Sequence, residues 1–244
     1  MASSSSRNPI LLALLVLCTT LIHTSSARPW RRGPSPFPDF DLSSYCPTLS
    51  NGTSSLSPPM SNVTLEAVVF GRGVQNYTCN ATDPTSAPTA IGAIATLFDA
   101  TPLLPLLPPS AGEEILNLLP AFLVCFPLSS LTSSSLPKLG VHYFDASGTP
   151  TFDLGSIGLL KAKKAQNIMA PPDASKGPED QGDGAVDWLR LTAKAGAGSR
   201  GLSEVYRVET AGGKSPPTCE GQPAAIEVQY AAQYWFYEQG RGFG

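Results

Sequence analysis

The clearest fold signal in this chain is the stretch TLEAVVF-GRG-VQNYTC, residues 64–79. β-branched and aromatic residues are typical of strands, and glycines between two such runs are typical of a hairpin-like turn. The stretch therefore predicts two strands, Thr64–Phe70 and Val74–Cys79, joined at Gly71-Arg72-Gly73.

Runs of the same character follow, and glycines or prolines separate them. They are Ala90–Asp99, Leu139–Phe144, Thr151–Leu154, Val186–Lys194, Leu202–Thr210 and Ile226–Tyr237. Short strands with turn signals between them are typical of sandwiches and barrels. We therefore expect a mainly β fold, an antiparallel sandwich or barrel-like single domain, over residues 61–240.

Residues 101–138 interrupt this pattern with a segment rich in Leu, Pro and Ser, which we interpret as an insertion. Within it, Ala111–Val124 (AGEEILNLLPAFLV) has two acidic residues near its start and apolar residues at helical spacing. The segment predicts one short helix, which Pro120 would kink or end.

The N-terminus has the order of a secretory signal peptide. Arg7 precedes the uncharged apolar run Ile10–Ile22, and Ser25-Ser26-Ala27 places small residues at a cleavage position. The apolar run is too short to span a bilayer. We expect a signal peptide at 1–27 and then a Pro/Ser-rich, extended lead-in at 28–60, in which Arg31-Arg32 is a solvated pair or a processing site.

An exported chain changes how the cysteines are interpreted. Cys18 leaves with the signal peptide, and the four that remain are Cys46, Cys79, Cys125 and Cys219. An even number predicts two disulfides, with three possible connectivities. A metal site is disfavoured, because the chain has no Cys-x-x-Cys and the only histidine after residue 27 is His142.

Four Asn-x-Thr sequons lie within 32 residues near the N-terminus of the expected mature chain, and for a eukaryotic host they predict glycosylation at Asn51, Asn62, Asn76 and Asn80.

The charge balance argues against a nucleic-acid partner. The chain has 16 Lys+Arg and 19 Asp+Glu, so removing Arg7 with the signal leaves 15 against 19, a net charge of −4. Strong binding to a phosphate backbone needs a concentrated basic face, and the only basic block is residues 28–32. No second apolar run reaches membrane-spanning length, so we expect no membrane span after signal removal.

Two kinds of hydrolytic site are conceivable. His142 could act as a general base oriented by Asp145 or Asp153, although no Gly-x-Ser-x-Gly elbow accompanies it. The alternative is a half-buried strand residue that bonds a backbone carbonyl. A pair of carboxylates could instead hydrolyse glycosides. The candidates for such a pair are Asp99, Asp145, Asp153, Asp187 and Glu204.

Strand alternation selects the candidate binding residues. If Asn76 carries a glycan, its face meets solvent, so Gln75 and Tyr77 point inward and either line a polar pocket or form a bonded core network. At the other end of the chain, Trp235 and Tyr237 share one strand face. That face could stack on sugar rings if exposed, or the strand could be covered on both sides.

Several blocks taken together resemble the DUF3455 family of unknown function, found in fungi and bacteria. They are GVQ with Tyr77 and Cys79, ATLFD (95–99), GVHY (140–143), VDWL (186–189), VYRV (205–208), Pro216 with Cys219, and YWFY (234–237). The resemblance covers roughly residues 65–238. Some members of the family are labelled malate dehydrogenase or malate dehydrogenase-like, but the family supplies no established activity.

The resemblance also suggests a disulfide pairing. About 40 residues, including Cys125, separate two strands that follow each other closely in family members, and Cys46 lies outside the shared region. Both are in added segments, which implies the pairs Cys46–Cys125 and Cys79–Cys219.

The dehydrogenase label finds no support in the residues. The nearest match to a dinucleotide-binding turn, Gly71–Asn76, has Asn76 in place of the third glycine, and no helix pattern follows it. We therefore expect no nicotinamide and no other cofactor.

Together these features predict a secreted, disulfide-linked glycoprotein in the extracellular space or cell wall. Its expected role is that of a non-catalytic module, which could bind carbohydrate or a cell-wall polymer through exposed aromatic side chains. The alternative is a secreted hydrolase that uses His142 or an acid pair. The sequence does not indicate an oligomeric state.

Overall fold

The computed structural model describes residues 42–107, 112–132, 136–178 and 183–239. The expected signal peptide and Arg31-Arg32 lie outside these residues. Within them, no helix has the length and apolar character that crossing a bilayer requires.

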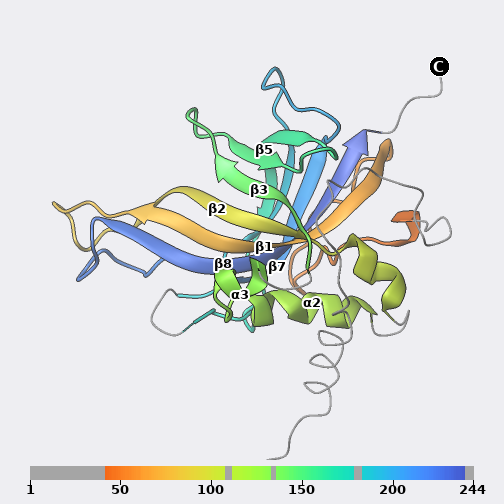
Figure 1. Cartoon of the computed structure of the whole chain (residues 1–244). Coiled ribbons are helices and arrows are strands. Elements are labelled where there is room, and N and C mark those ends of the chain that lie inside the picture. Colours follow the sequence, from red (N-terminus) through yellow and green to blue (C-terminus); the bar gives the residue numbers. More distant parts are fainter. Residues whose placement is uncertain (1–41, 108–111, 133–135, 179–182, 240–244) are drawn as a thin grey trace, which may run out of the picture.

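Eight antiparallel strands form one closed barrel, in which each strand pairs with its sequence neighbours and the first pairs with the last (Figure 1). They are β1 (Val63–Thr78), β2 (Thr89–Asp99), β3 (Lys138–Phe144), β4 (Pro150–Asp153), β5 (Leu159–Ile168), β6 (Trp188–Ala193), β7 (Glu204–Gly212) and β8 (Ala225–Gln239). β1, β2 and β8 are long and extend to the left of the view beyond the shorter strands. Because β1 pairs with β8 and the sheet closes on itself, the fold is the barrel and not the sandwich among the two predicted architectures.

β1 is one continuous strand, so the hairpin predicted at residues 71–73 is wrong. Both glycines pair with β2 on one side and with β8 on the other. A Cβ on Gly71 would lie 2.5 Å from Cε2 of Tyr234, and a Cβ on Gly73 would collide with the backbone oxygen of Ile94. The glycines therefore allow close packing inside a strand instead of forming a turn.

The sequence prediction also lacks β5. Its sequence, LLKAKKAQNI, is interrupted by three lysines, and only Leu160 and Ala162 are buried. The strand forms because its backbone pairs with β4 and β6 and completes the barrel wall.

The insertion contains more than the one predicted helix. It holds the 3-10 helix η2 (Thr101–Leu106) and the α-helices α2 (Gly112–Leu123) and α3 (Leu128–Thr132). α2 corresponds to the prediction, but Pro120 lies inside it and the helix continues to Leu123. A further 3-10 helix, η1 (Leu42–Ser44), lies in the lead-in.

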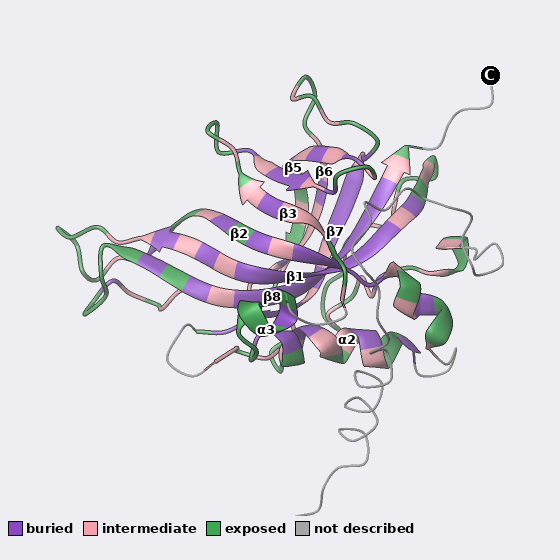
Figure 2. Ribbon diagram, viewed as in Figure 1, coloured by how far each residue is buried: buried purple, intermediate pink, exposed green. Residues whose placement is uncertain are grey.

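The barrel wall is buried on both faces over much of β1 and β8 (Figure 2). Alternation along β8 places Tyr234 and Phe236 in a luminal cluster and Trp235 and Tyr237 in an outer cluster. The outer cluster is completed by the insertion and the lead-in, which contribute Leu56, Leu104, Leu116, Leu123, Val124 and Leu131. α2 and α3 lie beneath the barrel in Figure 1.

One of the two expected disulfides is present. Cys79, just after β1, is bonded to Cys219, just before β8, with the two Cα atoms 5.5 Å apart. The bond links the extended ends of two paired strands, and its presence confirms this part of the pairing.

The second expected disulfide, Cys46–Cys125, is not formed, and both cysteines are exposed free thiols. Thr48, close to Cys46, bonds Glu113 at 2.7 Å and Asn117 at 3.0 Å in the first half of α2. Cys125 follows the opposite end of the helix. The rise from Asn117 to Cys125 is about 12 Å at 1.5 Å per residue. A disulfide needs Cα atoms within about 7 Å of each other.

Candidate functional site

The barrel interior contains a charged side chain, Arg207 of β7. Its neighbours alternate: Val205 belongs to the luminal cluster, and Tyr206 and Val208 belong to the outer one, so Arg207 faces the lumen. Its Nε and Nη2 donate to the backbone oxygen of Asp187 at 3.3 and 2.9 Å. No ion pair between described residues includes Arg207.

Two tyrosines of β8 lie beside this arginine. The hydroxyl oxygens of Tyr230 and Tyr234 are 3.1 Å apart, and both side chains are fully buried. Burial raises the pKa of both hydroxyls, while the charge of the Arg207 guanidinium opposes the rise. Both hydroxyls are therefore protonated at neutral pH and can donate or accept hydrogen bonds.

His142 of β3 also faces the lumen. Its ring stacks on Phe152 with centroids 4.1 Å apart, and Nδ1 lies 2.9 Å from the backbone oxygen of Thr151. Because a carbonyl oxygen only accepts, Nδ1 carries the proton and Nε2 keeps its lone pair. Burial lowers the pKa of His142 to about 4, and the Arg207 charge adds to this effect. His142 is thus neutral at neutral pH.

This shift gives His142 a defined influence on stability. The unfolded chain binds the imidazole proton near pH 6.5, whereas the folded chain binds it only near pH 4. The contribution of the neutral imidazole to the free energy of unfolding is therefore complete above about pH 6.5 and is lost as the pH falls from 6.5 through 4. The total loss is about 3 kcal/mol.

We expect His142→Phe to keep the ring packing and to flatten the decline in urea-unfolding free energy between pH 6.5 and 4. An unchanged decline would contradict the assignment.

Gln75 and Tyr77 lie on the inner side of β1, as strand alternation predicted. The Tyr77 hydroxyl donates to the backbone oxygen of Gly213 at 2.6 Å. The Gln75 side chain is 9% exposed, and its Nε2 has no hydrogen-bond partner. A Cβ on Gly213 would contact Gln75 and Tyr230 together, so these side chains are neighbours. An unpartnered buried amide costs about 1–3 kcal/mol, which a ligand acceptor would recover.

These side chains form one group, which we name the luminal polar cluster. It comprises Gln75, Tyr77, His142, Arg207, Tyr230 and Tyr234. Arg207 is the cross-strand neighbour of Tyr234, whose hydroxyl contacts that of Tyr230 and whose ring centroid lies 6.3 Å from that of His142.

Solvent reaches the luminal face on the side of β5 and β6. Ala162 is buried, but Lys164 and Asn167, farther along the same strand, are exposed. Arg207 and its cross-strand neighbour Leu189 are partly exposed. The cluster therefore extends from the closed interior to a solvent-accessible end of the barrel.

A family model for proteins of unknown function, DUF3455, matches residues 59–238. The match spans the barrel from β1 almost to the end of β8 and includes every member of the luminal polar cluster. The chain belongs to the DUF3455 family. No curated protein and no solved structure matches it.

In this DUF3455 protein the two carboxylates predicted to orient His142, those of Asp145 and Asp153, have other partners. Asp145 accepts hydrogen bonds from Ser147 and Thr149 within its own turn and pairs with Lys161 at 3.0 Å. These contacts, first of all the Ser147 hydroxyl, hold the pKa of Asp145 well below its usual range. Asp153 accepts from the amide of Gly155 at 3.0 Å. Both carboxylates stabilise turns, and neither orients the imidazole.

The other predicted carboxylates are also engaged separately. Glu204 pairs with Arg190, Asp187 accepts from the Asn167 amide at 2.9 Å, and Asp99 accepts from the amide of Thr101 at 3.0 Å.

Trp235 and Tyr237 are buried on the outer face, so the structure has no exposed aromatic strip there. They are 3% and 4% exposed. The Trp235 Nε1 donates to Gln233 at 2.9 Å, and the Tyr237 ring packs edge-on against Tyr206. The insertion and lead-in cover this face, so the strand is covered on both sides.

The four sequon asparagines differ in accessibility. Asn62 and Asn80 are exposed, whereas Asn51 and Asn76 are partly buried. The Asn51 amide donates to the backbone oxygen of Met169 at 2.9 Å, and the Asn76 Oδ1 is buried without a partner. Attachment of a glycan to Asn62 or Asn80 would disturb the fewest contacts.

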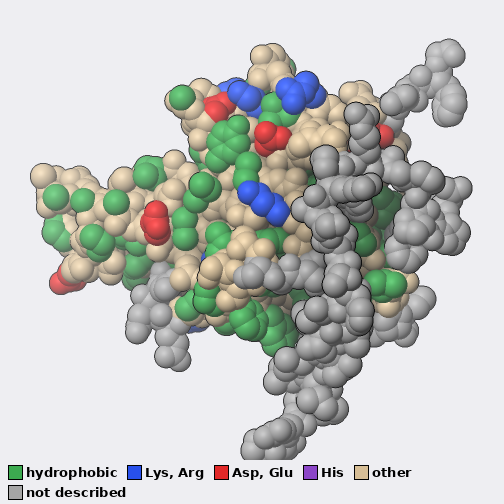
Figure 3. Space-filling model, viewed as in Figure 1, with side chains coloured by type: hydrophobic (Ala, Val, Ile, Leu, Met, Phe, Trp, Pro, Cys, Tyr) green, Lys and Arg blue, Asp and Glu red, His purple; other side chains and the backbone are tan. Residues whose placement is uncertain are grey.

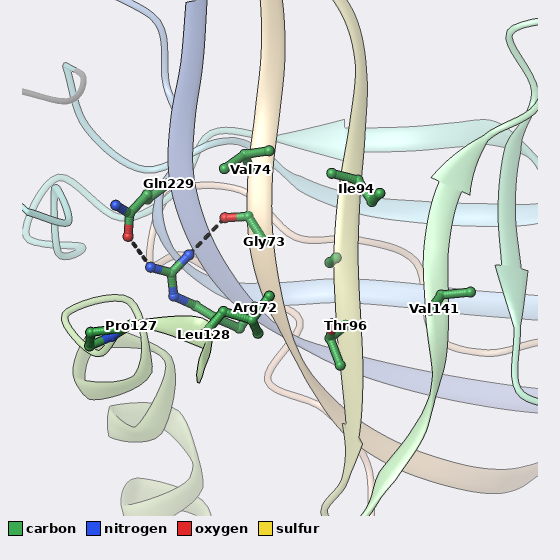
Figure 4. Close-up of a pocket in the computed structure, with 10 residues that line it drawn as sticks. Arg72, Gly73, Val74, Ile94, Thr96, Pro127, Leu128, Val141 and Gln229 are labelled. Atoms are coloured by element: carbon green, nitrogen blue, oxygen red, sulfur yellow. Dashed lines mark hydrogen bonds between the residues drawn. The ribbon is translucent and has the colours of Figure 1, made fainter. Parts of the chain in front are cut away.

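A groove of about 370 Å³ lies on the outer face of β1, β2 and β3 (Figure 4). Val74, Ile94 and Val141 form an apolar floor, and Pro127 and Leu128 form a wall at the start of α3. In the surrounding face, charged side chains are scattered over a mostly neutral surface (Figure 3).

The cation at the base of this groove has a structural role. Arg72 is 3% exposed and donates to the backbone oxygens of Leu123 and Val124 at 3.1 and 3.2 Å, to Gly73 at 2.8 Å, and to the Gln229 side chain. The first two are carbonyls at the C-terminal end of α2, where the helix dipole is negative. Arg72 thus anchors α2 to the barrel, and its donors are engaged.

Sequence reasoning missed Arg207, Tyr230 and Tyr234 as members of a site. One signal for Arg207 was present: in VYRV (205–208) the alternation that places Val205 inside also places Arg207 inside. The grouping of the three residues depends on the register of the β7–β8 pair, which sets Arg207 opposite Tyr234, and barrel closure between β8 and β1 adds Gln75 and Tyr77.

Proposed function

We propose that this DUF3455 protein is an exported, non-catalytic binding protein that takes a small polar ligand at the solvent-accessible end of its barrel. The observation that carries the proposal is the luminal polar cluster: an arginine without a carboxylate partner lies with a buried, unpartnered amide and three tyrosine hydroxyls. Buried polar groups are normally satisfied, so a set of this kind favours a bound molecule that completes its hydrogen bonds.

Export is supported by several independent features. Residues 1–27 have the pattern of a secretory signal, and four sequons follow. The Cys79–Cys219 disulfide fits an oxidising, extracellular environment. We therefore place the mature protein outside the cell or in the cell wall.

Binding is favoured over hydrolysis by the surroundings of His142. Nδ1 is committed to the Thr151 carbonyl, and no described carboxylate pairs with the ring. A general base is normally oriented by such a partner and lies within reach of a nucleophile. Carbohydrate remains a candidate ligand class, but it would have to bind at the barrel end, because Trp235 and Tyr237 are covered.

The proposal is tested by the thermal unfolding of the protein without residues 1–27 in the presence of neutral saccharides, sugar acids and small organic acids. A ligand that binds only the folded state at 100 times its Kd adds about 2.7 kcal/mol of stability, which raises the Tm by several degrees. We expect at least one class to do so. The rise should shrink in the double variant Tyr230→Phe with Tyr234→Phe, and it should persist in the control Tyr143→Phe.

Two outcomes would contradict the proposal. One is the absence of any stabilising compound. The other is hydrolysis of ester, peptide or glycoside substrates by the wild type that a folded His142→Ala variant loses, because His142 would then have a catalytic role.

A further inference from the structure

We propose that the ligand of the barrel is a small organic acid whose carboxylate is bound by Arg207. This inference rests on the proposed function and specifies the class of ligand. In the luminal polar cluster, the groups without a full set of partners are the Arg207 cation and the donor Nε2 of Gln75.

The guanidinium of Arg207 is positioned but not neutralised. Its Nε and Nη2 are held by one backbone oxygen, that of Asp187, which fixes the plane of the group. The Asp187 carboxylate is engaged with the Asn167 amide. An arginine has five N–H donors in a planar fork that matches the two oxygens of a carboxylate, so donors remain for such a ligand.

The groups around the guanidinium also favour an acceptor. The Gln75 Nε2 is a pure donor, buried and unpartnered. The Tyr230 and Tyr234 hydroxyls contact each other and keep further hydrogen-bonding capacity. A carboxylate provides about four lone-pair positions and therefore suits this set better than a neutral hydroxyl or amide.

The side chains next to the charged group favour a compact apolar body. Leu189 is the cross-strand neighbour of Arg207 and is partly exposed. Phe144 is 37% exposed, and its ring centroid lies 5.7 Å from that of His142. An apolar ring or short chain packed on these side chains would be removed from water while its carboxylate meets Arg207.

The experiment is isothermal titration calorimetry of the full mature protein at neutral pH. The probes are benzoate and hexanoate, their neutral amides benzamide and hexanamide, and inorganic phosphate. We expect a carboxylate to bind at least tenfold more tightly than its amide. Phosphate should bind at least tenfold more weakly than the carboxylates, because it has no apolar part to pack on Leu189 and Phe144.

Variants of the full chain separate the site from general charge effects. Arg207→Gln should weaken carboxylate binding at least tenfold, and Gln75→Leu should weaken it several-fold. Arg200→Gln removes an exposed arginine outside the lumen and should leave affinity unchanged. Thermal unfolding of each variant establishes that it is folded.

The failures are distinguishable. Equal binding of acid and amide, or unchanged carboxylate affinity in a folded Arg207→Gln variant, overturns the carboxylate inference and leaves a barrel that binds other ligands. Tight phosphate binding likewise overturns it. If none of these probes binds while a saccharide stabilises the protein, the ligand class is wrong and the proposed function stands. If nothing binds at all, both fail.

Discussion

Replacing Cys79 and Cys219 with serine lowers the free energy of unfolding by about 5 kcal/mol, because the bond closes a loop of 140 residues in the unfolded chain. The loop contains β2 to β7 and all three elements of the insertion. The loss acts through the unfolded state, which gains conformational freedom when the cross-link is removed. Urea unfolding of the double variant and the wild type, both without reductant, measures the difference.

The two free cysteines supply a matched control. Cys46→Ser with Cys125→Ser changes two exposed thiols that form no disulfide, so the free energy of unfolding should stay within about 0.5 kcal/mol. A loss of several kcal/mol in this control would show that Cys46 and Cys125 are bonded to each other in solution. A negligible loss in the Cys79/Cys219 variant would contradict the observed bridge.

Glu204→Gln is expected to destabilise the protein by about 3 kcal/mol, because it leaves the Arg190 guanidinium without its counter-charge. Glu204 is fully buried and pairs with Arg190, which is 15% exposed. It also accepts hydrogen bonds from the Tyr206 hydroxyl at 2.9 Å and the Met60 amide at 3.4 Å. Chemical unfolding of the variant measures the loss.

The position of Glu204 predicts a second readout. The Tyr206 hydroxyl also lies 2.8 Å from the backbone oxygen of Ser57, so its single proton is shared between this oxygen and Glu204, and Gln166 bonds the same serine. Loosening this network should release residues 54–60 and increase their cleavage in limited proteolysis. Asp145→Asn, which breaks a solvent-accessible pair with Lys161, should have a much smaller effect on stability and none on this cleavage. Equal effects of the two substitutions would contradict the argument.

Most strands could be predicted, because the periodicity of two in Ala90–Asp99, Leu139–Phe144 and Ile226–Tyr237 is a local property. Two errors have a physical cause outside the local sequence. Gly71 and Gly73 look like a turn, yet their missing side chains make room for Tyr234 and for the backbone of β2. β5 looks too polar for a strand, yet its pairing with β4 and β6 completes the wall.

The candidate site was only partly predictable. Alternation correctly placed Gln75 and Tyr77 on the inner face, but it also made Trp235 and Tyr237 candidates for an exposed surface. These aromatic side chains are buried because the insertion and lead-in pack on them. No local pattern specifies which segment will cover a strand face.

The sequence alone determined the strand-rich class, the signal-like leader, the even set of four cysteines after residue 27 and the family of the protein. Those features depend on residue order, composition and short-range periodicity. Only the tertiary structure decided that the sheet closes, that Cys79 bonds Cys219, and that Arg207 lies opposite Tyr234, which in turn contacts Tyr230 and lies near His142. These depend on pairing between residues far apart in the chain, and above all on β1 joining β8, a contact that local sequence cannot encode.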